Sequence, residues 1–268
     1  MNSKNYQVLI SIAVVLLTTM ASCGGHDDVQ DGNVDYFDRS KTFAEEVDGQ
    51  PYWFIPESVG SQNVLVTWNR INCNSIVDYV RLNAKYSGNV NVPSTITHNG
   101  VEYNVIGADD NAFYCCNQIT SLHLQEGMTR WGEHTWFCSP FRSLMTKVKD
   151  VYLPSSLEMT ELPAYYFMNN SSLETCHIPN VTTIGDSAFF KCSKLNNFVV
   201  PATVKTIGDG AFTSCSRLTN LHVEAVVPPY LSEEVSIAKK CDLYVPTGAK
   251  AAYEADQYWS EFKSIKEE

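Results

Sequence analysis

The sequence predicts a repeat solenoid, a right-handed stack of short β-strands and helical turns. Phenylalanine recurs with a nearly fixed period, and a short apolar segment of alternating polarity follows each one. The spacing lies in the low twenties except for one longer interval, between the second and third members of the set Phe113, Phe137, Phe167, Phe189 and Phe212. Such periods are typical of repeat architectures, in which neighbouring units bury each other's apolar faces. About five repeats are therefore expected.

Each repeat is expected to contain one short strand. The two clearest copies run through 181–201 and 204–223. In the first copy, Phe198 and Val200 are spaced as inward residues of a short strand, and Val199 between them points outward. The strands of successive copies should then lie side by side in one sheet.

The turn before the strand has its own pattern. Gly185 allows a tight bend. Asp186 is placed to cap a single helical turn, which positions Ala188 and Phe189 beneath the strand. Fainter copies of the same pattern occur upstream, and the repeat array is assigned to residues 106–242.

The N-terminus has the layout of a secretion signal. Residues 1–7 are short and polar, 8–21 are almost entirely apolar, and small residues then flank Cys23. The apolar segment is too short for a comfortable membrane span. We assign residues 1–22 to a lipoprotein signal peptide and 23–49 to an acidic, flexible tether.

The sequence Met20-Ala21-Ser22-Cys23 resembles the lipobox of bacterial lipoproteins. The resemblance implies that Cys23 is the lipidation site and that a lipid, without a transmembrane helix, anchors the protein. The alternative is an ordinary signal peptide followed by an incidental cysteine.

The segments on either side of the array are expected to cap it, because a solenoid needs polar-faced ends. Residues 50–105 are predicted to be a β-rich N-terminal cap, with a hairpin turn at Asn99-Gly100. Residues 243–268 are predicted to be a C-terminal cap. In it, residues 250–255 favour a helix, and Trp259, Phe262 and Ile265 fold back over the last repeat.

The repeat resembles a known family. The pattern I-G-D-x-A-F-x-x-C-x-x-L, followed by a short apolar strand, is similar to the BspA-type leucine-rich repeat of bacterial surface proteins. The C-terminal stretch from Leu243 and the lead-in from Tyr86 resemble the elements that flank such repeats. The resemblance implies a leucine-rich-repeat fold and a binding role with host-protein, cell-surface or glycan partners.

Charge and motifs exclude several classes of function. Removal of residues 1–22 takes away Lys4 and no acidic residue, so the formal charge changes from −11 to −12. This argues against nucleic acid as a partner. The sequence contains no nucleophile elbow, phosphate-binding loop, H-E-x-x-H motif or dinucleotide fingerprint. We expect no enzymatic activity and no cofactor.

Three cysteines share one position of the repeat. Cys116, Cys192 and Cys215 occupy the inward site that leucine-rich repeats fill with Asn or Cys, so they are expected to be buried free thiols. The disulfide state of the other cysteines of the mature chain stays open.

One outward position of the strand carries a possible binding column. Ten positions after the repeat phenylalanines come His123, His177, Val199 and His222, and the irregular repeat supplies Tyr152. This column is either a ligand-contacting surface or ordinary solvated sheet. Alternate strands lie about 9.5 Å apart, which is too far for three histidines to share one metal ion, so no metal site is expected.

An insertion in the irregular repeat is a second candidate for binding. It carries Trp131, Trp136 and Arg142, and aromatic residues with arginine are common in interfaces. The alternative is that these aromatic residues fill the irregular repeat. The resulting expectation is an outer-membrane lipoprotein that binds or adheres at the cell surface. A structural or assembly protein on the periplasmic side is the rival interpretation.

Overall fold

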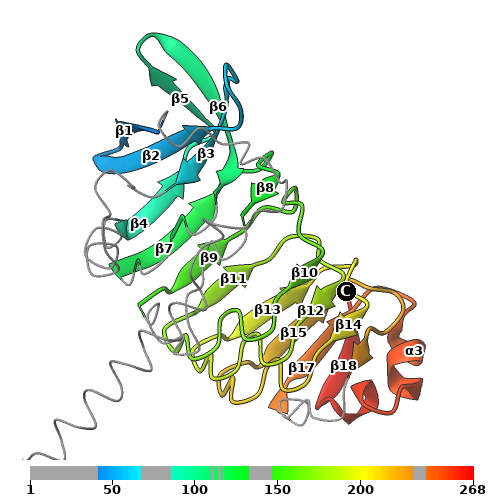
Figure 1. Ribbon diagram of the computed structural model, residues 1–268. Coiled ribbons are helices and arrows are strands. Elements are labelled where there is room, and N and C mark those ends of the chain that lie inside the picture. Colours follow the sequence, from blue (N-terminus) through cyan, green and yellow to red (C-terminus); the bar gives the residue numbers. More distant parts are fainter. Residues whose placement is uncertain are drawn as a thin grey trace, which may run out of the picture.

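The computed structural model describes residues 42–67, 86–109, 112–113, 116, 118–132, 147–231 and 240–268. Within these residues the chain is built mostly of short strands that follow one another along one long axis (Figure 1). The helices that the structure describes in full are α3 (Lys250–Ala255) and the 3₁₀ turn η3 (Trp259–Glu261), both near the C-terminus. None of the described helices is long and apolar enough to cross a membrane.

The first sheet has the order β1-β2-β3-β6-β5, with β8 paired to β6. Its strands are β1 (Phe43–Val47), β2 (Gln50–Pro56), β3 (Asn63–Thr67), β5 (Thr95–His98), β6 (Val101–Ala108) and β8 (Arg130–Trp131). The predicted hairpin is confirmed: β5 and β6 pair antiparallel, and Asn99 and Gly100 adopt φ angles of 50° and 78°. Positive φ at both central residues is what a two-residue hairpin of this twist requires.

Strand β1 lies inside the segment that the sequence assigns to a flexible tether. Residues 43–47 instead pair antiparallel with β2. The ring of Phe43 stacks on His98 at 4.2 Å and lies 5.8 Å from Phe54. The imidazole Nδ1 of His98 also lies 2.5 Å from the carboxylate of Glu45. Residues 43–47 thus form a strand because they contact β2 and β5. The composition of the segment alone does not predict these contacts.

A long series of parallel strands forms one face of the molecule. It comprises β4 (Ser87–Val92), β7 (Gln118–Leu124), β9 (Asp150–Tyr152), β11 (Thr175–His177), β13 (Asn197–Val200), β15 (Asn220–Val223), β17 (Asp242–Val245) and β18 (Ser264–Glu267). Strand pairing runs in the order β4-β7-β9-β11 and again in the order β13-β15-β17-β18. Strands β11 and β13 are therefore the facing edges of two sheets, and they contact each other (Figure 1).

The residue that follows each predicted outward position in the repeats is buried. These residues are Leu124, Leu153, Ile178, Val200 and Val223, at or directly after the strand ends, each exposed by 2% or less. Because side chains alternate along a strand, burial of this set places the residues between them on the outside. The alternation predicted from the sequence is thus confirmed.

A second, narrower series of strands lies on another side of the repeats. It contains β10 (Glu161–Leu162), β12 (Thr183–Ile184), β14 (Thr206–Ile207) and β16 (Tyr230–Leu231), all parallel. One residue of each strand is buried, and these are Leu162, Ile184, Ile207 and Leu231. The repeats therefore contribute strands to two parallel series, the long one and the narrower one.

The helical turn predicted after Gly185 is wrong, because the segment is a run of β-turns instead. The N–H groups of Ser187, Phe189 and Lys191 donate to carbonyls of the next repeat at 2.8–2.9 Å. The N–H groups between them close turns within their own repeat, and Ser187 and Lys191 adopt positive φ. Every second N–H thus joins neighbouring repeats, whereas in a helix each N–H would donate to a carbonyl four residues earlier in the same segment.

Asp186 and Gly185 also have different roles from those predicted. The Asp186 carboxylate accepts a 2.9 Å hydrogen bond from the N–H of Asp209 in the next repeat, so it does not cap a helix. Gly185 does not adopt positive φ; a Cβ there would lie 2.4 Å from the backbone nitrogen of Ala164. Glycine is therefore required by the close approach of neighbouring repeats, not by a tight bend.

One continuous apolar core runs through the stack. Phe189 lies between Phe167 and Phe212, with ring centroids 5.2 and 5.3 Å apart. The thiols of Cys192 and Cys215 are buried and free, and they donate to the carbonyls of residues 167 and 189. Cys116 is likewise buried and forms no disulfide, so the predicted inward cysteine position is confirmed.

The C-terminal segment packs on the last repeats as expected. Helix α3 has the predicted bounds, and its Tyr253 hydroxyl donates 2.6 Å to the carbonyl of Ala225. Trp259 is fully buried, with ring centroids 5.2 Å from Tyr253 and 5.3 Å from Phe262. Strand β18 then joins the edge of the parallel sheet beside β17.

Candidate binding face

The outward residues of the long parallel series form one column, which we call the ring column. Its members are Asn91, His123, Tyr152, His177, Val199, His222, Tyr244 and Lys266. Strand register places each member beside the next, except between His177 and Val199, whose strands contact without pairing. The outward orientation predicted from the sequence is confirmed, and whether the column contacts a ligand stays a prediction.

The N-terminal part of the column, which we call its upper part, is a stack of the rings of His123, Tyr152 and His177. Tyr152 and His177 lie nearly parallel, 4.5 Å apart with an interplanar angle of 18°. His123 meets the other side of Tyr152 edge-on at 6.3 Å. Offset and edge-to-face ring pairs at these distances are favourable.

The C-terminal part of the column, its lower part, contains a similar stack. His222 and Tyr244 lie 4.5 Å apart with an interplanar angle of 8°. The ammonium group of Lys266 lies 5.0 Å from the centre of the Tyr244 ring and 3.4 Å from its hydroxyl oxygen. A cation beside the ring adds a cation–π contact to the stack.

Acidic residues hold several rings in place. The Tyr152 hydroxyl donates 2.5 Å to Glu126, and this carboxylate raises the pKa of Tyr152. His123 Nε2 bonds to the carboxylate of Asp150, and His222 Nδ1 lies 2.8 Å from that of Glu268. The rings are therefore oriented before any partner arrives, which lowers the ordering cost of binding.

A second outward column runs beside the rings and is polar throughout. It consists of Asn89, Ser121, Asp150, Thr175, Asn197, Asn220, Asp242 and Ser264. Small amide, hydroxyl and carboxylate groups thus lie along one side of the ring column. Such groups can donate to or accept from a partner's polar atoms.

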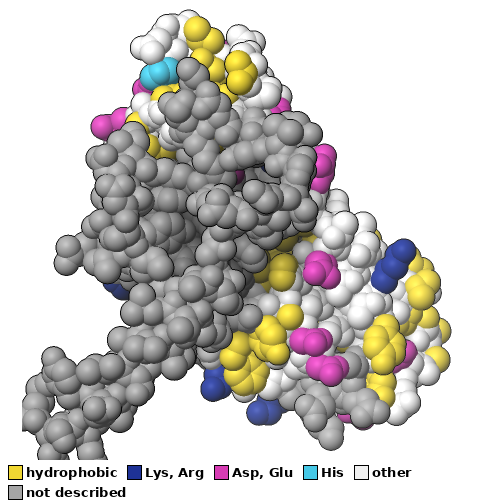
Figure 2. All heavy atoms as spheres, in the orientation of Figure 1, with side chains coloured by type: hydrophobic (Ala, Val, Ile, Leu, Met, Phe, Trp, Pro, Cys, Tyr) yellow, Lys and Arg dark blue, Asp and Glu magenta, His cyan; other side chains and the backbone are white. Residues whose placement is uncertain are grey.

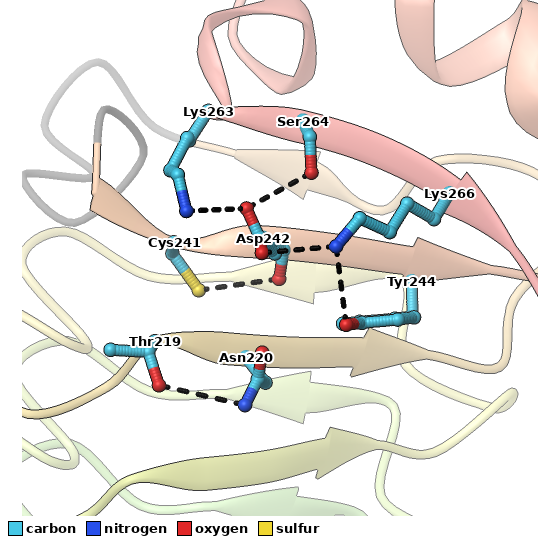
Figure 3. A network of polar contacts seen from close by, with 8 residues as sticks. All are labelled: Thr219, Asn220, Cys241, Asp242, Tyr244, Lys263, Ser264 and Lys266. Atoms are coloured by element: carbon cyan, nitrogen blue, oxygen red, sulfur yellow. Dashed lines mark hydrogen bonds and ion pairs between the residues drawn. The ribbon is translucent and has the colours of Figure 1, made fainter.

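Asp242 is the centre of the lower part of this polar column (Figure 3). Its carboxylate lies 3.1 Å from the ammonium of Lys263 and 3.0 Å from that of Lys266, and it accepts a 3.0 Å hydrogen bond from Ser264. Hydrogen bonds from Lys266, Lys263 and Ser264 lower the pKa of Asp242 to about 2. The same network fixes the Lys266 ammonium beside Tyr244, and Figure 3 shows it between the Asp242 carboxylate and the Tyr244 hydroxyl.

The sequence prediction missed three members of the ring column. The step from His222 to Tyr244 equals the step from Tyr244 to Lys266, and both equal the shortest phenylalanine spacing. The repeat period was therefore a sufficient signal for Tyr244 and Lys266. Asn91 precedes His123 by an interval that matches no repeat spacing, and only the pairing of β4 with β7 reveals it.

The insertion candidates are only partly described. Trp131 lies on β8, half-buried against the core, and its indole N–H donates 2.9 Å to the hydroxyl of Tyr166. This placement fits the role of filling the irregular repeat. Trp136 and Arg142 lie outside the described residues, as do Cys23 and the signal segment.

The described residues contain no group of three or more histidine, cysteine or acidic side chains placed to hold a metal ion. Along the ring column, Tyr152 separates His123 from His177. Burial raises the pKa of Cys215 and of Cys241 to about 12, which keeps both thiols protonated at neutral pH.

The molecule therefore offers an extended face of oriented rings and polar groups. Figure 2 shows another part of the surface, where hydrophobic and acidic side chains are interspersed over the C-terminal half. Among the exposed apolar residues are Tyr230, on β16 of the second parallel series, and Val226 and Val227, which precede that strand in the sequence. None of them belongs to the ring column.

Comparison with known families gives a direct match. The model of the BspA type leucine rich repeat region matches in six copies, over residues 94–158 and 160–229. That is one copy more than the phenylalanine spacing predicts. No curated protein is similar enough to the chain to count as a match.

Several solved bacterial structures are similar to the chain. A leucine-rich repeat protein of T. pallidum is 21% identical, with 76% of this chain and 74% of that chain covered and a TM-score of 0.44. The pneumococcal vaccine antigen PcpA is 17% identical, with 84% and 47% covered and a TM-score of 0.46. A leucine-rich cell surface protein of Faecalibacterium prausnitzii is 16% identical, with 84% and 72% covered and a TM-score of 0.37. The chain thus spans about half the length of the pneumococcal antigen.

Proposed function

The chain belongs to the BspA-type leucine-rich-repeat family, and from this premise we propose that it is an adhesion or binding protein of the cell surface. Its ligand is a protein or a glycan on another surface, and the ring column is the contact face. The strands and turns form a solenoid, which the N-terminal sheet and the C-terminal segment cap. The protein performs no catalysis.

The observation that supports this proposal is the ring column itself. Tyr152, His177, His222 and Tyr244 form two ordered stacks on an exposed sheet face. Aromatic residues are enriched in the cores of protein interfaces because they bring a large contact area at a small cost in conformational entropy.

Anchoring is the second part of the proposal. The lipobox at Cys23 supports a lipid anchor in the outer membrane, and residues 24–41 then connect the anchor to β1. A Cys23→Ala variant should leave the membrane fraction. If this variant remains membrane-bound after a carbonate wash, the lipid anchor is wrong.

The experiment that tests recognition is a binding screen on arrays of glycans and host proteins. Wild type is compared with a variant that carries His123→Ala, His177→Ala and His222→Ala. A matched control carries Thr183→Ala, Thr206→Ala and Tyr230→Ala, which are outward residues of the second parallel series. We expect the histidine variant to lose any signal that wild type gives and the control variant to keep it. Equal binding by the two variants would exclude the ring column as the contact face.

Protease treatment of intact cells tests the location. Cleavage of the protein on the cell surface supports adhesion. Full protection in intact cells, with cleavage after the outer membrane is opened, would reject the surface location. The rival role would then apply, a structural or assembly protein that docks a partner of the same cell.

A further inference from the structure

The ring column is interrupted at Val199. On one side of this residue lies the stack of Tyr152 and His177, and on the other side the stack of His222 and Tyr244. Val199 is 41% exposed, so its small side chain leaves the space above it open to solvent. The column therefore has a gap, one residue wide, at its centre.

Both imidazoles beside the gap are held towards their own stacks. His177 Nδ1 lies 2.8 Å from the carbonyl oxygen of Leu153, on the β9 side of β11. His222 Nδ1 lies 2.8 Å from the carboxylate of Glu268, which follows β18. Each imidazole thus stacks on a tyrosine through one face and turns the other face towards Val199. Among the described residues, no ring stacks on these inner faces.

The width of the gap suits one planar ring. Val199 and His222 lie on paired strands about 4.8 Å apart, whereas β11 and β13 contact within 8 Å without pairing. His177 and His222 are therefore separated by about 10–13 Å across Val199. A ring midway would lie about 5–6.5 Å from each imidazole, within the favourable range for ring pairs of about 4.5–7 Å. The two existing stacks, whose strands do pair, have ring centroids 4.5 Å apart. Because β11 and β13 contact without pairing, no backbone ladder narrows the gap.

The surroundings of the gap are amphipathic. The Val199 side chain provides an apolar floor, and Asn197 lies two positions away on the same outward side of β13. Asn220 is paired with Asn197 in the polar column. A ring that enters the gap would contact the apolar side chain of Val199. Polar groups attached to that ring would lie near the amide side chains of Asn197 and Asn220.

We propose that this gap is a slot that receives one aromatic side chain of a protein partner, clamped between His177 and His222. The proposal rests on the proposed binding function and specifies its partner. The slot is open to solvent above Val199, so a free ring would have few contacts to offset the entropy that association costs. When the ring belongs to a protein, the other contacts between that protein and the ring column help to offset the entropy that association costs.

The first test fills the slot from within. In a Val199→Phe variant, the new ring should lie between the imidazoles and shift the Cε1 proton resonances of His177 and His222 upfield by ring-current effects. His98, in the N-terminal sheet, should not move. A Thr183→Phe variant adds the same ring to the second parallel series and should shift neither His177 nor His222. If Val199→Phe leaves both resonances in place while the protein stays folded, no ring fits and the proposal fails.

The second test presents the ring from outside. N-acetyl-tyrosinamide, titrated to high millimolar concentration into the purified protein, should shift His177 and His222 together, and Val199→Phe should abolish the effect. N-acetyl-leucinamide should have no effect. If methyl glucoside shifts the two histidines and the tyrosine compound does not, the slot takes a sugar and the proposal is overturned. The binding screen on glycan and protein arrays does not depend on these shifts. Absence of the shifts would therefore reject the slot, whereas loss of binding on the arrays bears on the adhesion role.

Discussion

The indole N–H of Trp259 donates a 2.7 Å hydrogen bond to the backbone carbonyl of Pro229 inside the protein. This bond ties the C-terminal segment to the last repeat, which is distant from it in the sequence. Because both groups are buried, loss of the donor leaves the carbonyl without its partner, which costs about 1–3 kcal/mol. We predict that Trp259→Phe lowers the free energy of unfolding by this amount, and Trp259→Ala by about 3–5 kcal/mol.

Urea denaturation followed by circular dichroism measures both changes. The exposed Tyr230 provides the control, since Tyr230→Phe should change stability by less than about 0.5 kcal/mol. If Trp259→Phe is as stable as this control, the hydrogen bond to Pro229 contributes nothing.

Two glycines in one turn should respond differently to alanine. A Cβ on Gly208 would lie 2.6 Å from the backbone nitrogen of Asp186, so the neighbouring repeats must separate. A Cβ on Gly210 would approach nothing closer than 3.4 Å, and the cost there comes only from its φ of 61°. We predict that Gly208→Ala costs about 3 kcal/mol and Gly210→Ala about 1 kcal/mol.

Chemical denaturation of the two variants gives the comparison. Hydrogen exchange adds a local measurement, because the N–H of Gly208 donates to the carbonyl of Ile184 in the preceding repeat. That N–H should exchange faster when the repeats are forced apart. Similar losses in the two variants would refute the close-approach explanation.

The corresponding glycine of the preceding repeat, Gly185, shows what the sequence can and cannot predict. The repeat period and the alternation of apolar residues predicted the inward column through Val200 and the outward column through His222, because each rests on local periodicity. The physical role of Gly185 could not be predicted, since its nearest obstacle, the backbone at Ala164, belongs to another repeat. The prediction that Gly185 allows a tight bend considers only its own segment, and it is wrong.

Other differences have the same origin. The run of β-turns around Phe189 is stabilised by hydrogen bonds to the next repeat, whereas capping rules for Asp186 consider only its own segment. Strand β1 forms because Phe43 stacks on His98, which belongs to a strand much later in the sequence. By contrast, the sequence alone suffices to predict Tyr244 as a member of the ring column, because its spacing from His222 equals a spacing of the repeat phenylalanines.

The Asp242 network should make stability depend on pH in the acid range. The folded-state pKa of Asp242 is about 2, below its ordinary value of 3.8. A depressed pKa means that the ionised carboxylate favours the folded state. This contribution is present above about pH 4 and is lost as the pH falls towards 2. Asp242→Asn should therefore be less stable than wild type at pH 7 and equally stable near pH 2.

Urea midpoints at pH 7, 4 and 2 measure this convergence. Because Lys263 and Lys266 are largely exposed, high salt should also narrow the difference at pH 7. Glu224→Gln, at an exposed carboxylate, serves as the control and should show no such pattern. A difference between Asp242→Asn and wild type that is unchanged at pH 2 would refute the ionic explanation.

The buried cysteines should be chemically inert while the protein is folded. Cys215 is 2% exposed, and its thiol donates 3.0 Å to the carbonyl of Phe189. Burial raises its pKa to about 12, so at pH 8 only about one thiol in 10⁴ is ionised, and the thiolate is the reactive form. We predict that iodoacetamide leaves Cys215 and Cys192 unmodified in the native protein and modifies both in urea.

Peptide mass spectrometry after alkylation measures the modification at each position. Cys215→Ser should preserve folding, because a hydroxyl can donate to Phe189 as the thiol does, whereas Cys215→Val removes the donor and should lower stability by about 1–3 kcal/mol. Labelling of native Cys215 at the rate seen in urea would mean that the repeats open readily. Protection would show instead that neighbouring repeats stay closed. The two ring stacks on either side of Val199 need such a rigid support if a partner's ring is to find both imidazoles in position.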